Sequence, residues 1–439
     1  MNYKKDSNYI KKYVGFLKQQ YNFKGLYHFT DFENLESIFK SGYLYSRNGC
    51  NKNKIIFKDG ANHDVLDKAQ DTVHDSVRLY YRPKTPTLYD NEGVKLKEYC
   101  DKIHIPMPVY LLFDEELLYL DTTKFSNGNA TRSDIGCTYE FFQSMDWSAI
   151  FHSTWFYPEE RDYIVNKRHA ELLSSKPISI DKYLKSIIFR CEADRKRAIN
   201  VYGHNSKYEV DLSIFSDKNT GHARNDWQEN NFVKDYNICY EFYENLRKKK
   251  LIIEIEFQKL FTDYDIQFVI EDVNGVNITK NKNYIYKIEK IYIDEFGNKC
   301  KTKENCKKGL IEISGNIEEI GKFYLYINGI LYIDEDFLKE EIRKYEMFLK
   351  EQNNEKFIFT WLLKNNKSLN YIHRYEILDI NNNIIKSRII DFGDYKESVS
   401  WKLTLDDYNE NWYKIKYYID DIVYIHDTIC NKKVICTEE

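Results

Sequence analysis

The chain has 439 residues, 65 basic and 69 acidic side chains, a formal net charge of −4 and a hydrophobic fraction of 42%. This composition supplies a core for one large domain or two ordinary ones, and it excludes a disordered tail, a collagen-like repeat and a small disulfide-stapled scaffold. The sequence contains no apolar stretch of about 18 residues, the length that would be needed to span a membrane. Its nine cysteines show no Cys-x-x-Cys spacing, which favours reduced thiols in the cytoplasm over disulfides or bound zinc.

The front half of the chain mixes helical and strand patterns, which predicts an α+β fold. Apolar side chains at helical spacing predict a helix over residues 8–21, and a short strand is expected over 24–29. Thr30 and Glu33 have the spacing of a capping box ahead of a second helix, which Gly42 should end. Runs rich in β-forming residues predict further strands at 77–81, 108–113 and 186–190.

From residue 251 onward the pattern is almost wholly β. Strands are expected at 251–257, 266–270 and 284–288, separated by turn signals. Residues 322–335 resemble residues 413–426, since each segment has a strand, a two-residue turn and a second strand. Two copies of a small β-sandwich, or one large sandwich, would produce this internal repeat. A helix over 336–352 is expected to separate the copies.

These patterns divide the chain into three parts. Residues 1–200 form the expected α+β domain, 201–250 an extension or linker with a plausible hinge at the lysines 248–250, and 251–439 a sandwich-like, β-rich accessory region. Residues 1–250 carry a net charge of +3 (38 basic and 35 acidic side chains), and residues 251–439 carry −7 (27 and 34). A mildly basic front half could approach a polyanion, but it is far from the basic stripe of a dedicated nucleic-acid binder.

Two candidate binding segments are 25–31 and 77–93. His28 lies at a strand end just ahead of a helix, where its imidazole could face a ligand or simply bond to a nearby carbonyl. In 77–93 a strand leads into a loop stiffened by Pro83 and Pro86, which presents Arg, Lys and Tyr side chains with little loss of entropy. Arg binds phosphate and Tyr stacks on flat rings, although a solvated basic turn would have the same sequence.

Two further candidate segments are 124–130 and 167–173. Small polar turn residues in the first could form a substrate rim in front of an aromatic helix, or a plain loop. If the second is a strand, His169, Glu171 and Leu173 share one face. A carboxylate flanked by apolar residues is costly to bury unless it is used. Glu171 is therefore either a solvent-facing side chain or a functional one.

In this order the four segments resemble the DarT family, the DNA-targeting ADP-ribosyltransferase toxins of toxin–antitoxin systems. The resemblance covers roughly residues 22–195. Its matching pieces are Leu26-Tyr-His-Phe-Thr30, Leu35-x-x-Ile38, Gly42-x-Leu44, Pro83-x-x-Pro-x-x-Tyr89, Asn129-Ala130, Asp146-Trp147 and Arg168-x-Ala-Glu171. The continuation from Tyr89 to Gly93 and the long β extension are more similar to the branch that modifies guanine than to the branch that modifies thymine.

The resemblance implies a compact ADP-ribosyltransferase fold that holds NAD in the cleft of a split β-sheet and requires no metal. Glu171 falls on the catalytic glutamate of the family, and His28 is placed at the nicotinamide-riboside side of NAD as a second catalytic residue. The residues expected to bind NAD are Tyr27, His28, Phe29, Leu44, Arg78, Arg82 and Tyr89. Those expected to contact DNA are Lys84, Asn129, Arg168 and His169.

One position departs from the family pattern. The thymine branch has an arginine in the stretch that aligns here with residues 67–72, where this chain has none. The residues that could supply the positive charge instead are Arg78, Arg82, Lys84 and His74. The sequence therefore does not identify the group that anchors the NAD phosphates.

The expected function is that of a cytoplasmic toxin that transfers ADP-ribose from NAD to a base in single-stranded DNA, guanine rather than thymine. A carboxylate beside the sugar would stabilise the positive charge that develops as nicotinamide leaves, and it would help deprotonate the attacking nitrogen. The resemblance also implies a toxin–antitoxin or phage-defence setting and a macrodomain antitoxin as partner. Two alternatives stay open: an acceptor in RNA or protein, and a non-enzymatic module whose β half binds a partner.

Overall fold

The computed structural model describes residues 2–58, 71–94, 105–215, 232–243, 248–258, 265–280, 285–291, 308–315, 320–337, 342–352, 354–363, 372–390, 400–405, 408, 411–419, 422–429 and 434–437. Its contacts divide the chain into two units. The first contains Met1–Arg190 and Glu209–Asn230, and the second contains Cys191–Tyr208 and Asn231–Glu439. The boundaries expected from the sequence, at residues 200 and 250, differ from this division.

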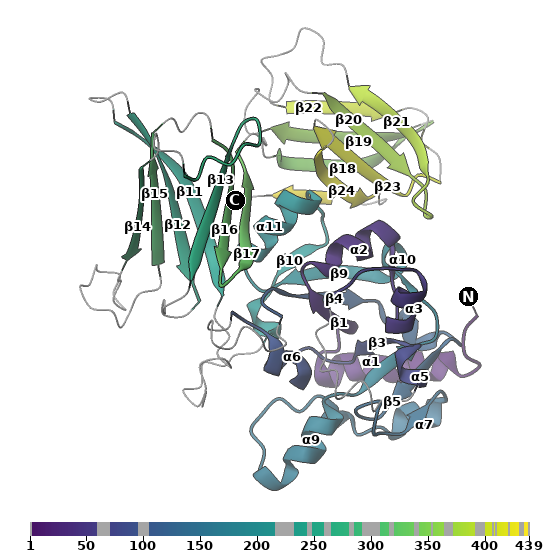
Figure 1. Cartoon of the computed structure of the whole chain (residues 1–439). Helices are drawn as coiled ribbons and strands as arrows, with labels where there is room; N and C mark the ends of the chain where they lie inside the picture. The colour runs from purple at the N-terminus through teal and green to yellow at the C-terminus, as the bar shows by residue number, and fades with distance from the viewer. Residues whose placement is uncertain are drawn as a thin grey trace. The chain divides into compact units, whose positions relative to one another are not determined.

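The first unit is built on an eight-stranded sheet with the strand order β10-β9-β4-β1-β3-β7-β5-β6 (Figure 1). Its strands are β1 (Leu26–Asp31), β3 (Val77–Tyr80), β4 (Pro108–Phe113), β5 (Thr123–Ser126), β6 (Ile135–Gly136), β7 (Glu171–Ser174), β9 (Leu184–Phe189) and β10 (Tyr208–Val210). A separate pair joins β2 (Tyr43–Leu44) to β8 (Ile178–Ser179). Every residue of β4 is buried, because this strand lies between β1 and β9. The predicted strands that became β1, β3, β4 and β9 are confirmed.

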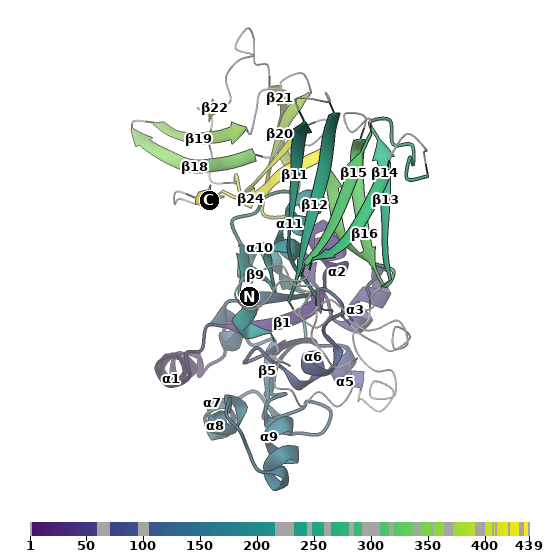
Figure 2. The ribbon, with the colours of Figure 1, turned by 90° about the vertical axis from the view of Figure 1, so that its left-hand side faces the viewer.

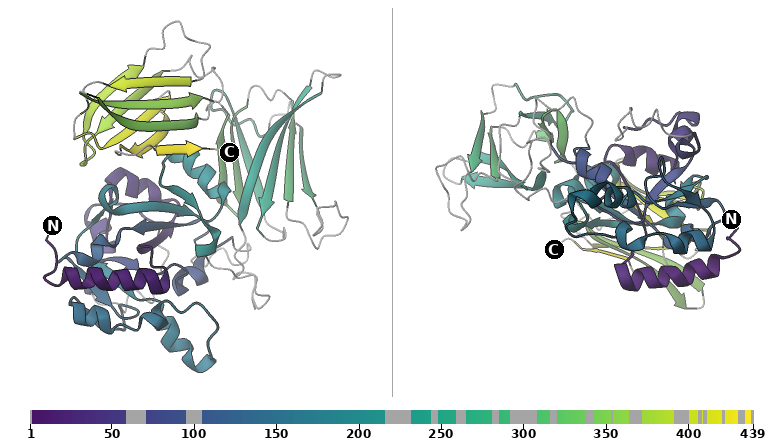
Figure 3. Two further views of the ribbon diagram at one scale, coloured as in Figure 1. Left: turned by 180° about the vertical axis from the view of Figure 1, so that it is seen from behind. Right: turned by 90° about the horizontal axis from the view of Figure 1, so that it is seen from below.

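Helices lie on both sides of this unit. Figures 1 and 3 show α1 (Ser7–Tyr21) on the opposite side from α2 (Asn34–Ser41) and α3 (Arg47–Lys52). The predicted first helix is confirmed, since α1 buries Ile10, Val14 and Leu17. The other helices are α5 (Asp71–His74), α6 (Pro86–Asn91), α7 (Tyr139–Ser144), α8 (Trp147–Ile150), α9 (Arg161–Lys167) and α10 (Ile180–Tyr183).

The expected capping box ahead of α2 is wrong, whereas the expected end of this helix is confirmed. Thr30 belongs to β1, and its hydroxyl accepts a hydrogen bond from the side-chain amide of Asn34. The helix begins at Asn34 after Glu33, and no side-chain hydrogen bond caps it. Gly42 ends it with a φ of 72°, a left-handed conformation that favours a residue without a Cβ atom.

The second unit contains two β-sandwiches (Figures 1 and 2). The first consists of the sheets β11-β12-β15-β14 and β13-β16-β17, and the second of the sheets β22-β19-β18-β25 and β21-β20-β23-β24. The strands of the first are β11 (Val233–Tyr243), β12 (Lys248–Phe257), β13 (Ile266–Asp272), β14 (Ile285–Ile291), β15 (Lys308–Ser314), β16 (Ile320–Ile327) and β17 (Ile330–Asp336). Those of the second are β18 (Ile342–Gln352), β19 (Asn354–Leu363), β20 (His373–Leu378), β21 (Ile384–Ile390), β22 (Ser400–Leu405), β23 (Lys414–Ile419), β24 (Ile422–Thr428) and β25 (Val434–Thr437).

The strand order of each sandwich is immunoglobulin-like. The seven strands of the first sandwich, lettered in chain order, form an A-B-E-D sheet and a C-F-G sheet. In the second sandwich the fourth strand, β21, lies beside β20 in the opposite sheet. The two similar segments, 322–335 and 413–426, occupy the last hairpin of each sandwich, β16–β17 and β23–β24.

Two expectations for the second unit are wrong. The helix expected over 336–352 is absent, because residues 342–352 form β18, which pairs antiparallel with β19 and with β25. Pairing with two neighbouring strands outweighs the weak helical preference of this stretch. The expected hinge at 248–250 is the start of β12, which pairs there with residues 241–243 of β11.

The helix α11 (Glu192–Tyr202) belongs to the second unit. Arg197 donates a hydrogen bond of 2.8 Å to the carbonyl of Leu331, and the side-chain amide of Asn200 donates one of 2.8 Å to Glu335. These bonds to the first sandwich explain why residues 191–208 group with the β-sandwiches and not with the sheet that precedes them.

Candidate active site

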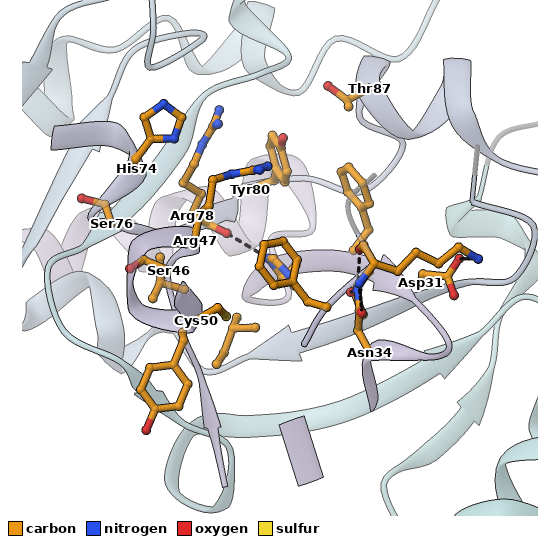
Figure 4. A pocket seen from close by; sticks show the side chains of 18 of the residues that line it. Asp31, Asn34, Ser46, Arg47, Cys50, His74, Ser76, Arg78, Tyr80 and Thr87 are labelled. Atoms are coloured by element: carbon orange, nitrogen blue, oxygen red, sulfur yellow. Dashed lines mark hydrogen bonds and ion pairs between the residues drawn. The ribbon is translucent and has the colours of Figure 1, made fainter. Parts of the chain in front are cut away.

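A cavity of about 610 Å³ opens in the first unit. Its walls include residues of β1, α2, β2, α3, α5, β3 and α6, and of the segments 55–58, 129–131 and 165–169. Figure 4 shows Arg47, Arg78 and His74 on one side of it and Asp31 and Asn34 on the other. Segments that lie far apart in the sequence therefore share one site.

The cavity lies where two neighbouring strands separate. β1 pairs with β4 along its whole length, but a single residue pair, Tyr27 with Tyr80, joins β1 to β3 among the described residues. Beyond this pair the imidazole of His28 reaches across, with Nδ1 3.1 Å from the carbonyl oxygen of Arg78. The divergence of β1 and β3 therefore leaves room for side chains of both strands to face the same space.

Glu171 is a buried carboxylate at the edge of this site. It is the first residue of β7, lies opposite Tyr80 of β3 and is 0% exposed. Its Oε2 atom accepts hydrogen bonds from Nε and Nη2 of Arg78, at 2.9 and 2.8 Å. Its Oε1 atom is buried and has no hydrogen-bond partner within the described part of the chain. A charge in such a place is stabilised by its pairing with Arg78.

Arg78 and Tyr80 are the neighbours of this carboxylate on β3, since Arg78 pairs with it and Tyr80 lies opposite it. Both line the cavity, whereas Glu171 does not. Although burial disfavours the charged form of Arg78, the carboxylate of Glu171 raises the pKa of Arg78 above its ordinary value. Burial, and then the same carboxylate, raise the pKa of Tyr80. Arg78 is therefore a cation and Tyr80 a neutral phenol at neutral pH.

His28 is a neutral imidazole at neutral pH. Burial lowers its pKa to about 4, and the nearby guanidinium of Arg78 acts in the same direction. Because the carbonyl of Arg78 can only accept a hydrogen bond, Nδ1 of His28 carries the proton. Its Nε2 atom is then a hydrogen-bond acceptor.

The structure brings half of the predicted site residues together. Those that line the cavity are His28, Phe29, Leu44, Arg78, Asn129 and His169. Those that do not line it are Glu171, which lies directly behind Arg78, and Tyr27, Arg82, Lys84, Tyr89 and Arg168. Some residues of this second group contact neighbouring segments of the first unit, and Tyr89 is exposed to solvent.

Arg82 and Arg168 contact neighbouring segments of their own unit. The guanidinium of Arg82 is buried and donates to the carbonyls of Pro83, Ile150 and His152. Burial lowers the pKa of Arg82 to about 10, and the nearby charge of Arg168 contributes. Arg168 lies over the ring of Phe156 and bonds to the imidazole of His152. Both side chains thus fix the segment from Ile150 to Arg168.

The three remaining residues are Tyr27, Lys84 and Tyr89. The first two contact the buried Tyr110, and the third is exposed to solvent. Tyr27 packs edge-on against Tyr110, with ring centroids 5.8 Å apart. The backbone amide of Lys84 donates to the hydroxyl of Tyr110. Tyr89, on α6, is 46% exposed. Their predicted contacts with NAD or DNA stay predictions.

The sequence analysis missed several residues of the cavity wall. Arg47 follows the short strand β2, lines the cavity and lies over the ring of Phe57. On the opposite wall Asp31 forms an ion pair of 2.9 Å with Lys58, whose backbone amide donates to Asn34. Arg47 could have been found, because it closely follows the matched segment that ends at Leu44. Residues 67–72, where the thymine-modifying branch has an arginine, lie mostly outside the described residues.

Neither a metal site nor a membrane-spanning helix is found in the described part of the chain. There, no three or more His, Cys, Asp or Glu side chains gather in a way that could hold a metal ion. Likewise, none of the described helices combines the length and the apolar character that crossing a bilayer requires.

Comparison with known families bears on the same region. Residues 27–216 match a DarT family model. The description of this family is "ssDNA thymidine ADP-ribosyltransferase, DarT". The match includes Glu171, His28 and Arg78, and it ends before the two sandwiches. The description names thymidine, so the expectation of guanine stays a prediction.

The solved structures that are similar to this chain include "Thermosipho africanus DarTG in complex with ADP-ribose". The identity is 20% and the TM-score 0.34, over 44% of this chain and 51% of that chain. The chain thus spans about half the length of the solved structure that it matches. No curated protein matches the chain.

Proposed function

We propose that the DarT-matching region transfers ADP-ribose from NAD to a base in single-stranded DNA, with guanine as the preferred acceptor. The observation that carries this proposal is the buried carboxylate of Glu171, paired with Arg78 at the wall of a cavity that His28 also lines. A buried, charged pair beside a pocket is the arrangement expected of a catalytic site.

NAD would lie in the gap between β1 and β3. The Nε2 atom of neutral His28 would accept a hydrogen bond at the nicotinamide-riboside side, and Phe29 and Leu44 would supply apolar wall. Arg47 lines the cavity on the same side as Arg78, and its guanidinium suits a diphosphate. Arg47 therefore takes the place of Arg82 as the phosphate contact in this proposal, because Arg82 is committed to backbone carbonyls.

Glu171 would act on the sugar and on the acceptor. Its negative charge stabilises the positive charge that develops on the ribose as the bond to nicotinamide breaks. Because Glu171 itself does not line the cavity, its carboxylate would have to become accessible when NAD and DNA bind. Oε1, which has no hydrogen-bond partner among the described residues, would then take the proton of the attacking nitrogen, a step worth on the order of 10²–10⁴-fold. Arg78 holds this carboxylate in place through its two hydrogen bonds.

The acceptor would enter past the segment that carries Asn129 and His169, both of which line the cavity. A base inside a duplex cannot reach such a site, so the substrate is single-stranded or an extruded base. Guanine is proposed on the resemblance of residues 89–93 to the guanine-modifying branch. Lys84 and Arg168 are proposed to hold the backbone phosphates.

Mass spectrometry of defined oligonucleotides after incubation with protein and NAD tests the proposal. A single-stranded oligonucleotide with one guanine should gain the mass of one ADP-ribose, and the same sequence with thymine as its reactive base should gain less. Glu171→Gln should abolish the gain, while Glu140→Gln, on the exposed surface of α7, should leave it unchanged. Modification of RNA or protein in place of DNA, or an active Glu171→Gln protein, would overturn it.

We further propose that the protein is a toxin whose partner is a macrodomain antitoxin, in a toxin–antitoxin or phage-defence system. This proposal rests on the family resemblance. Expression in a bacterial host should stop growth, and a macrodomain hydrolase should restore growth and remove the added mass. Growth arrest that persists with Glu171→Gln would contradict it, because toxicity would then be independent of the transfer reaction.

A further inference from the structure

An exposed row of aromatic side chains runs along α1 in the first unit. Tyr9 is 60% exposed and Phe16 is 46% exposed, whereas Tyr13 and Tyr139 of α7 are half-buried. The ring centroid of Tyr139 lies 5.5 Å from that of Tyr9 and 6.4 Å from that of Tyr13. The ring of Phe16 continues the row, 5.4 Å from Tyr13. These four residues, together with Lys12, are called the α1 surface below.

The helical period leaves this row outside the core. With about 3.6 residues per turn, positions 9, 12, 13 and 16 share one side of α1, and positions 10, 14 and 17 share another. The core takes the second side, since Ile10, Val14 and Leu17 are buried. Figure 3 shows α1 on the outside of the first unit. Single exposed rings are ordinary in soluble proteins, but a contiguous row of them marks a binding surface.

The same helix is basic. Residues 1–21 contain five lysines and one acidic side chain, which gives a net charge of +4. The acidic one, Asp6, accepts a hydrogen bond from the backbone amide of Tyr139 and so holds α7 beside α1. Lys12 is exposed, three residues after Tyr9 and four before Phe16, and it forms no ion pair with any described side chain. Its charge is therefore available beside the rings.

Flat rings beside an available cation suit single-stranded nucleic acid. Unpaired bases stack on aromatic side chains, and lysine contacts the phosphates between them. A membrane surface would instead need the large apolar side of the helix, which α1 turns toward the core. Because the proposed acceptor is a base of single-stranded DNA, this polyanion is the occupant that the surface fits.

One segment connects the α1 surface to the cavity. At its start, the ring centroid of Trp147 lies 6.4 Å from that of Tyr13, and Phe151 stacks on Tyr21 at 4.9 Å. At its end, His169 lines the cavity. Helix α1 itself lies on the opposite side of the unit from α2 and α3, which wall the cavity (Figures 1 and 3). The α1 surface can therefore contact only nucleotides that lie outside the cavity.

We propose that the α1 surface binds the part of the single-stranded DNA that extends outside the cavity. Bases of this part stack on Tyr9 and Phe16, and a phosphate pairs with Lys12. This inference rests on the proposed function, because it takes DNA as the acceptor. The α1 surface raises the affinity for long strands and takes no part in the transfer reaction.

Fluorescence anisotropy with a labelled oligonucleotide tests the surface without NAD. For a strand of about 20 nucleotides, the double variant Tyr9→Leu with Phe16→Leu should raise Kd roughly tenfold, because it removes the flat rings and keeps apolar bulk. The double variant Tyr9→Phe with Phe16→Tyr keeps both rings and should stay within about twofold of the parent protein. Unchanged binding by the leucine variant would overturn the proposal.

Salt dependence separates the contact of Lys12 from the general charge of the helix. Lys12→Gln should lower the slope of log Kd against log salt by about 0.7, the value of one phosphate contact on a single strand. Lys11→Gln removes the same charge from the same helix outside the row, so this matched control should leave the slope unchanged. Equal slopes for Lys12→Gln and the parent protein would contradict the assigned contact.

Transfer kinetics distinguish this inference from the proposed function. With NAD saturating, the leucine variant should raise KM roughly tenfold for the long oligonucleotide, and it should leave kcat and the KM of a strand of about four nucleotides unchanged. If the proposed function fails, the parent protein modifies neither oligonucleotide, yet anisotropy still reports whether the α1 surface binds DNA. Binding to phosphatidylserine vesicles in place of the oligonucleotide would assign the surface to a membrane and overturn the inference.

Discussion

Arg78 determines the geometry of the site through both its backbone and its side chain. Its carbonyl bonds to Nδ1 of His28, and its guanidinium bonds to Oε2 of Glu171. One residue of β3 thus fixes the tautomer of the imidazole and the position of the carboxylate. The sequence analysis placed Arg78 among the NAD-binding residues and among four candidates for the phosphate anchor, whereas the structure pairs its guanidinium with Glu171.

The lowered pKa of His28 predicts a dependence of stability on pH. The folded state holds this imidazole neutral down to about pH 4, whereas the unfolded chain protonates near pH 6.5. Between these values the unfolded state binds more protons, so stability falls as the solution is acidified, by up to about 3 kcal/mol from this group. Urea unfolding measures this effect in the parent protein and in His28→Gln. Between about pH 7.5 and 4, the free energy of unfolding should fall less in the variant than in the parent protein. Equal losses in both proteins would contradict the buried neutral state.

At the scale of elements, two glycines should respond in opposite ways to the same substitution. Gly42 ends α2 with a φ of 72°, so Gly42→Ala should lower the free energy of unfolding by about 1 kcal/mol. Gly15 lies inside α1, and an added Cβ atom would meet nothing within 4 Å. Gly15→Ala should therefore raise the free energy of unfolding by about 0.5–1 kcal/mol. Chemical denaturation measures both, and a loss of stability in both variants would contradict the assigned conformations.

The pattern of apolar residues in the sequence predicted the helices and strands whose buried residues recur with a helical or strand period. It failed for elements whose conformation depends on pairing with segments far away in the sequence. The face of α1 formed by Ile10, Val14 and Leu17 could be seen in the sequence, as could the buried run of β4. The strand β18 could not, because its conformation depends on pairing with β19 and β25. Likewise, the family motif located Glu171, but only the fold shows that this carboxylate pairs with Arg78 and does not itself line the cavity.

At the scale of the whole molecule, the candidate active site and the two sandwiches belong to different units. The cavity lies in the first unit, the DarT match covers most of that unit together with residues 191–208 of the second, and the immunoglobulin-like sandwiches lie outside the match. Each unit has a core of its own: Tyr110 and Ile188 belong to a buried cluster of the first, and Phe359 and Tyr417 to one of the second. A role of the sandwiches in positioning DNA, sensing a trigger or restraining the toxin stays a hypothesis, because only their architecture is seen.

Because each unit has its own core, a ligand that binds in the cavity should stabilise the first unit against unfolding and leave the second unit unchanged. ADP-ribose at 100 times its Kd should stabilise the first unit by about 2.7 kcal/mol, because it binds the folded form alone. Hydrogen exchange should therefore slow in β1, β3 and β4 and remain unchanged in β19, β20 and β23. Leu44→Trp, which would fill part of the cavity, is the matched control and should abolish the effect. Equal protection of both units would show that they unfold as one body, and protection confined to the sandwiches would place the ligand outside the cavity of Glu171 and His28.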